Sequence, residues 1–191
     1  MATTQTDTKV LIGEVRFSYV HVFKPEAVDG GSDAKYSVSL IIPKSNTELV
    51  EKIKNGIKIA FESGVAAKWG GKKPAPGTWK NPLRDGDVER PDDEAYAGAF
   101  FINATSRKQP GIVKAPKPFT PITNEDEFYS GCLGFASVNF FAFNTNGNKG
   151  VAAGLNNVLK TKDGDYLGGR ASAESDFADV DVPDDMPEEI W

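Results

Sequence analysis

The sequence has little of what disulfides, zinc sites and catalytic triads require. Its 191 residues include one cysteine, Cys132, and one histidine, His21. One cysteine excludes an internal disulfide, and together the two side chains supply too few ligands for a zinc site. A single histidine inside an alternating strand pattern argues against a Ser-His-Asp triad. We therefore expect His21 to be an ordinary strand residue and Cys132 to be a small buried hydrophobe.

Long apolar runs and nucleotide-binding loops are also missing. No stretch approaches the roughly 18 consecutive apolar residues of a membrane span. The polar N-terminus, MATTQTDTK, lacks the apolar segment of a secretory signal, and no P-loop pattern occurs. With the single cysteine, these absences favour a protein of the reducing cytoplasm.

One acidic segment keeps a catalytic alternative open. Five carboxylates between positions 85 and 93 could hold Mg²⁺ in a nuclease. Gly86 and Pro91 interrupt the segment, so no regular register brings the carboxylates together. A solvated loop is the preferred interpretation. The five carboxylates are Asp85, Asp87, Glu89, Asp92 and Asp93.

What the chain does have is typical of a β-rich domain. Hydrophobic residues make up 39% and aromatic residues 10%, which is enough for a packed core. Nineteen glycines and twelve prolines favour short strands and turns over a helical bundle. The length allows one domain with a tail.

Charge is divided unequally along the chain. The formal net charge is −5, but eight of the 27 acidic residues follow position 173, and no Lys or Arg follows Arg170. Without those eight, 22 basic residues face 19 acidic ones, so residues 1–173 carry a net +3. The body is mildly basic and the tail strongly acidic, a pattern typical of an interaction tail.

The stretch from Phe128 to Lys162 predicts the central hairpin. Asn146-Gly147 separates two apolar runs, and Asn-Gly is a strong hairpin signal. In the first run, Phe141 and Asn139 share one face, and the smaller apolar residues share the other. We expect the small face to lie against the core and the aromatic and polar face to be available for contacts.

Further elements are expected on either side. Strands are predicted over residues 9–19, extended past a bend near Tyr19, and over 35–42 and 96–106. In the first strand, Leu11, Val15, Phe17 and Tyr19 fall on one face. A capping box with Ser45 at the cap predicts a helix to about residue 67. The usual OB order has the helix after the third strand, so either the first strand is two strands or the topology is a variant.

Two basic connectors have the composition of single-strand binding sites. Residues 68–94 place Trp69 and Trp79 among lysines, and Arg107-Lys108 open a second, proline-rich connector. Cations contact phosphates, and aromatic rings stack on bases. The alternatives are that both tryptophans pack back onto the barrel and that the second connector is an ordinary solvated linker.

The tail, residues 173–191, mixes high charge with few apolar residues, so we expect it to be disordered. Its final acids precede Ile190 and Trp191. A solubilising extension is the alternative to a partner-binding tail.

Several segments together carry a resemblance to a known family. GCLGFASVNFFAF, GNKGVAAGLNNVLK, DGDYLGGR, KYSVSLIIPKSN and AFFINATS occur in this order across residues 8–170. They resemble a family of phage single-stranded DNA-binding proteins, long catalogued only as a domain of unknown function. The resemblance implies an OB-like barrel, no catalysis, and sequence-independent binding of single-stranded DNA in phage replication or recombination. The tail is similar to the acidic tails of single-strand binders, which dock into partner proteins and compete with DNA.

The prediction is a mainly β protein: a flexible N-terminus at 1–8, a five-stranded OB-like barrel with one helix at 9–172, and the tail at 173–191. It needs no cofactor and no metal, and it is not an enzyme. The alternatives are a tail-mediated recruitment or annealing protein and a Mg²⁺-dependent nuclease. The expected DNA contacts are Trp69, Lys72, Lys73, Trp79, Lys80, Arg84, Arg107, Lys108, Asn139, Phe141, Phe143 and Lys149. The expected partner contacts are Asp184, Asp185, Glu188, Glu189, Ile190 and Trp191.

Overall fold

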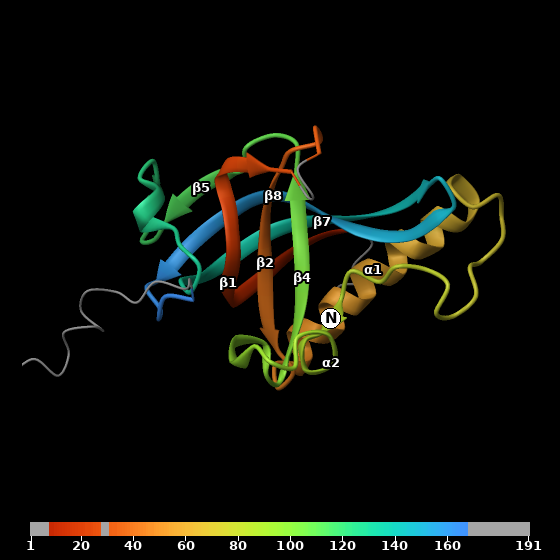
Figure 1. Ribbon diagram of the computed structural model, residues 1–191, viewed down its shortest axis with the longest axis horizontal. Helices are drawn as coiled ribbons and strands as arrows, with labels where there is room; N and C mark the ends of the chain where they lie inside the picture. The colour runs from red at the N-terminus through yellow and green to blue at the C-terminus, as the bar shows by residue number, and fades with distance from the viewer. Residues whose placement is uncertain (1–7, 28–30, 168–191) are drawn as a thin grey trace, which may run out of the picture.

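The computed structural model describes residues 8–27 and 31–167 (Figure 1). The predicted tail and the N-terminal residues 1–7 lie outside them. The strands are β1 (Lys9–Glu26), β2 (Lys35–Pro43), β3 (Arg84–Asp85), β4 (Ala99–Ser106), β5 (Gly111–Lys114), β6 (Thr120–Pro121), β7 (Leu133–Thr145) and β8 (Asn148–Lys162). The helices are α1 (Thr47–Ala67), α2 (Gly86–Glu89), and the short 3-10 helices η2 (Glu94–Tyr96) and η3 (Glu125–Glu127).

Five of these strands close into a barrel. The sheet runs β3-β4-β2-β1-β7-β8-β5-β6, and an additional parallel pairing joins β4 to β8. That pairing places Ala104 beside Ala153 and Thr105 beside Gly154. The predicted five-stranded OB-like barrel is therefore confirmed, with β1, β2, β4, β7 and β8 as its strands.

The helix position is a variant of the usual OB order. β1 is one continuous strand, whose first half pairs with β7 and whose second half pairs with β2. The interpretation of residues 9–26 as two strands is therefore wrong. α1 connects β2 to β4, the second and third barrel strands, and lies beneath the projecting β7–β8 hairpin (Figure 1).

The start of α1 differs from the sequence prediction by one residue. Asn46, not Ser45, is the cap, because its side chain accepts a hydrogen bond from Leu49 N at 3.3 Å. The two helix glycines lie where the helix approaches the barrel most closely. A Cβ on Gly56 would stand 2.8 Å from Val10, and one on Gly64 would stand 2.3 Å from the Cβ of Ala142.

The side-chain pattern of β1 also corrects the prediction. Leu11 is 54% exposed, whereas Val10 and Ile12 are fully buried. The pairing register with β7 shifts between Ile12 and Val15, and this irregularity exchanges the faces, so that Val15 is buried. Tyr19, predicted to share a face with Val15 and Phe17, is half exposed, whereas those two residues are buried.

The core side of β7 follows strict alternation, whereas β2 buries five consecutive residues from Val38 to Ile42. On β7 the small inner face is buried as predicted, including Ala136, Val138 and Phe140, and Cys132, just before the strand, is buried too. A second, smaller cluster lies outside the barrel, where Tyr96, Phe101, Ala99 and Ile41 pack together. The acidic segment 85–93, expected as a solvated loop, thus lies among the short elements β3, α2 and η2, which cover part of the outer surface.

Nothing in the described ranges suggests a membrane helix: none of their helices has both the length and the hydropathy that a span needs.

Candidate nucleic-acid interface

The arm, residues 139–154 of β7 and β8, projects beyond the barrel and has two distinct faces (Figure 1). α1 covers one face. The other carries Phe141, which is 49% exposed, and Asn139, which is also exposed. A Cβ on Gly154 would lie 3.5 Å from the Phe141 ring, so this ring extends along the strand over the glycine. The prediction that the aromatic and polar face is available for contacts is consistent with this arrangement.

A row of paired residues continues from the arm round the outer surface of the barrel, and most of them are small or polar. Asn139 pairs with Gly154, Gly154 with Thr105, Thr105 with Ser37, and Ser37 with His21. Paired residues place their side chains on the same face of a sheet. With strands about 4.8 Å apart, four spacings give a path of about 19 Å along the curved surface. We call Asn139, Gly154, Thr105, Ser37 and His21 the outer row.

The outer row is suited to a ligand that approaches the backbone closely. Thr105 and Asn139 are exposed, and Ser37, Gly154 and His21 are partly exposed. None of them is bulky and aliphatic, so the path is lined by hydroxyl, amide, imidazole and bare backbone groups. The strand 2–3 face of an OB barrel, here β2 and β4, is where OB folds bind oligonucleotides.

Lys80 joins the arm on the Phe141 side. Its backbone N donates to Lys149 O at 2.9 Å, and its carbonyl accepts from Val151 N at 3.0 Å, so it docks as a parallel bridge beside Gly150. A Cβ on Gly150 would lie 2.8 Å from the Cβ of Lys80, which places both on one face. That face is also the face of Phe143, because Phe143 pairs with Gly150.

Both tryptophans pack back onto α1. Trp69 is 5% exposed, its ring centroid is 5.0 Å from that of Phe61, and its Nε1 donates to Phe143 O at 3.1 Å. The structure thus contradicts base stacking by Trp69, since its ring is already enclosed. Trp79 is half-buried and stacks against the same Phe61 at 4.7 Å.

Apart from Arg84, the remaining predicted cations fall into three groups. Lys72 and Lys73 are exposed in the turn after Trp69. Lys149 pairs with Asn144, so alternation directs it to the α1 side of the arm and away from Phe141. Arg107 and Lys108 are exposed and follow Thr105 by two and three residues, about 7–10 Å along the chain.

Arg84 is not brought to the outer row. It pairs with Phe101, four residues before Thr105, and its guanidinium lies over the Phe101 ring at 5.1 Å. Its Nε donates to Glu89 at 2.6 Å, so its charge is already compensated. Arg84 therefore belongs to the packing of the 84–98 segment rather than to this path.

Lys44 ties the same segment to β2. Its Nζ donates to Asp85 at 2.8 Å and to Asp87 at 2.7 Å. The hydrogen bond from Lys44 is the main cause that lowers the pKa of both carboxyls, and Gly98 N also donates to Asp87. These carboxylates, two of the five that could have held Mg²⁺, are thus engaged in an ion-pair network. Across residues 8–27 and 31–167, no group of three or more His, Cys, Asp or Glu side chains is arranged to hold a metal ion.

Sequence reasoning missed four residues of this surface: His21, Ser37, Thr105 and Gly154. The first lies at a backbone irregularity, and the other three are small residues whose importance comes from strand register alone. The predicted tail contacts, from Asp184 to Trp191, fall outside the described residues.

Comparison with known proteins assigns the chain to a family. A sequence model of the family described as the ssDNA-binding protein of Enterobacter phage Enc34 matches residues 8–187. Protein p50 of Acyrthosiphon pisum secondary endosymbiont phage 1 is 34% identical over 186 residues, which cover 93% of this chain and 96% of that protein.

Solved structures agree with this match. The ssDNA-binding protein of bacteriophage Enc34, in complex with ssDNA, has a TM-score of 0.73 at 26% identity, over 84% of this chain and 90% of that chain. The gp2.5 single-stranded DNA-binding protein of bacteriophage T7 has a TM-score of 0.56 at 15% identity, over 95% of this chain and 98% of that chain, and shows the shared fold. The chain therefore belongs to the Enc34 family of phage single-stranded DNA-binding proteins, as its sequence motifs predicted.

Proposed function

We propose that this protein binds single-stranded DNA without sequence readout by laying the strand along the arm and the outer row, during phage DNA replication or recombination in the host cytoplasm. Family membership makes it a non-catalytic DNA-binding protein rather than a Mg²⁺-dependent nuclease. The observation that carries the assigned path is the register of the outer row, which links the exposed Phe141 to the strand 2–3 face of the barrel.

The chemistry of this path matches a flexible polyanion with stacking bases. Phe141 offers a half-exposed ring to a base, and Asn139 offers an amide to a base or sugar. Lys80, Arg107 and Lys108 are exposed beside the path, and of the three only Arg107 has an ion pair within the described residues, to Asp33 at 3.7 Å. Cations beside an aromatic platform are the recurring arrangement of single-strand binding surfaces.

The test is Phe141→Ala in a binding titration with labelled single-stranded DNA. Loss of one stacked base weakens binding by about 1–3 kcal/mol, and we expect a salt slope near that of the wild type because no cation is removed. Phe119→Ala is the matched control, since Phe119 is 43% exposed and lies beside β6, across the barrel from the arm. Equal losses for the two variants would argue against this path.

We further propose that residues 173–191 compete with DNA for the basic surface and recruit replication or recombination proteins. Eight carboxylates without a single Lys or Arg after Arg170 support an anionic segment that resembles the ligand in charge. Deletion of 174–191 should raise DNA affinity at low salt, and the difference should shrink as salt screens the charges. Unchanged affinity after deletion, with loss of partner binding, would favour recruitment as the tail's only role.

A further inference from the structure

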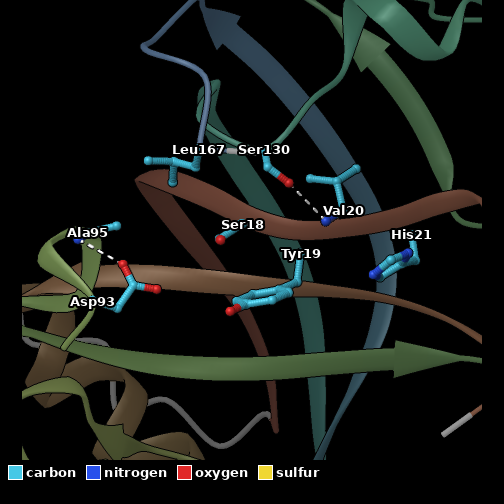
Figure 2. A pocket seen from close by; sticks show the side chains of 8 residues that line it. All are labelled: Ser18, Tyr19, Val20, His21, Asp93, Ala95, Ser130 and Leu167. Carbon is cyan, nitrogen blue, oxygen red and sulfur yellow. Dashed lines mark hydrogen bonds between the residues drawn. The ribbon is translucent and has the colours of Figure 1, made fainter. Parts of the chain in front are cut away.

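A pocket of about 380 Å³ opens at the His21 end of the outer row (Figure 2). This volume is near the lower end of the range for small-molecule sites, which suits one planar group better than an extended chain. Its walls come from β1, from the turn before η2, and from the segments that precede β7 and follow β8. The lining residues are Ser18, Tyr19, Val20, His21, Asp93, Ala95, Ser130 and Leu167.

Tyr19 supplies the aromatic surface of this pocket. Its φ is +46°, in the left-handed region that a bulky side chain rarely adopts, and the β1–β2 register shifts at this point between Ser18 and His21. Such strained residues cluster at functional sites. The backbone here turns Tyr19 away from the face of the buried Val15 and Phe17 and leaves it 50% exposed.

The Tyr19 ring is held from behind by Arg90. The guanidinium lies 4.8 Å from the Tyr19 ring centroid, and Nη1 donates to the Tyr19 hydroxyl at 3.1 Å. The same guanidinium lies 4.8 Å from the Tyr96 ring, and Tyr96 is fixed by its hydroxyl, which donates to Ser39 at 3.0 Å. One face of Tyr19 is thus fixed, while half of the side chain stays open to solvent.

The polar groups of the pocket suit a hydrogen-bond donor. One Asp93 oxygen accepts from Ala95 N at 3.1 Å, and Figure 2 shows the other oxygen turned toward Tyr19. Ser130 Oγ accepts from Val20 N at 3.2 Å and keeps its own proton to donate. A carboxylate repels phosphate but accepts well from an exocyclic amino group, as in the carboxylate contact to cytosine N4.

We propose that this pocket holds one nucleobase of the bound strand, stacked on Tyr19, with its exocyclic amino group donating to Asp93. The proposal rests on the DNA path assigned above, which it extends from the arm to β1. Uracil places a carbonyl oxygen where cytosine carries the amino group, so the same carboxylate disfavours uracil. The pocket therefore adds a base preference at one position of the strand, whereas the arm and the outer row read no sequence.

The test compares oligodeoxynucleotides of about 12 nucleotides, within the range of one OB fold, made only of dC or only of dU. The full-length wild type should bind the dC strand about 5- to 100-fold more tightly. Asp93→Asn keeps an oxygen for Ala95 N and replaces the free oxygen by an amide donor, so the preference should disappear or reverse. Equal wild-type affinities, or a preference that survives Asp93→Asn, would overturn the proposal.

Tyr19 is tested in the same titrations. Tyr19→Ala should weaken binding of both strands by about 5- to 100-fold, and Tyr19→Phe, which keeps the ring, should stay within about twofold of the wild type. Thermal unfolding of each variant identifies any loss of folding, and in that case Asp93→Asn decides the outcome. If Phe141→Ala weakens binding and folded Tyr19→Ala does not, the pocket assignment fails while the proposed function stands. If the wild type binds neither strand, the proposed function itself fails.

Discussion

The two faces of the arm differ in the burial of their side chains, although the same strand contributes to both. On the inner face, Phe140 is 1% exposed and packs against α1 at Gly56, where a Cβ would lie 3.1 Å from its ring. On the outer face, its neighbour Phe141 is 49% exposed, and its ring extends over Gly154. Adjacent residues of one type therefore differ in environment because β alternation separates them. We therefore expect the inner face to contribute most of the stability and assign the proposed DNA contact to the outer face.

The largest expected effect tests the inner face. Phe140→Ala should lower the free energy of unfolding by about 3–5 kcal/mol, because a buried ring is lost and a cavity is left behind. Phe141→Ala should change it by less than about 1 kcal/mol, since half of that ring is already in solvent. Denaturant titrations of the two variants measure the contrast. Similar losses of stability for both would remove the distinction between the faces.

Substitutions at two glycines should change stability less and test the same contrast between the inner and outer faces. Gly64→Ala places a Cβ 2.3 Å from the Cβ of Ala142, so overpacking of about 1–3 kcal/mol should outweigh the gain in helix propensity of about 1 kcal/mol. Gly154→Ala meets only ordinary contacts at 3.5 Å and is the outer-face control. Thermal unfolding should show a lower Tm for the first variant and a small change for the second. A raised Tm for Gly64→Ala would show that α1 is not closely packed there.

Local sequence patterns correctly predicted the features that depend on residues close together in the chain. Alternation assigned Phe141 to the outer face and Val138 to the inner one, and Asn146-Gly147 located the hairpin. The prediction of Ser45 as the helix cap was wrong by one residue, because Asn46 is an equally good capping residue and only the backbone path distinguishes them.

The features that the sequence did not predict depend on packing between residues far apart in the chain. Trp69 is enclosed by Phe61 and bonded to Phe143 O, which is 74 residues away, and no local signal reveals such a partner. The outer row needs the register of β8, β4 and β2 together before Gly154, Thr105 and Ser37 become neighbours. Tyr19 was assigned to the wrong face because a shift in register and a positive φ interrupt the alternation of β1.

The central claim is that single-stranded DNA follows the outer row. The most direct test introduces a positive or a negative side chain at the middle residue of the row, Thr105. Thr105 is exposed there, so Thr105→Lys and Thr105→Glu should both fold, with the same changes at exposed Thr123 as controls. Binding should be tighter for Thr105→Lys, with a salt slope steeper by about 0.7, and weaker for Thr105→Glu. If the Lys and Glu variants at position 105 differ no more than those at position 123, the strand does not pass over this part of the barrel.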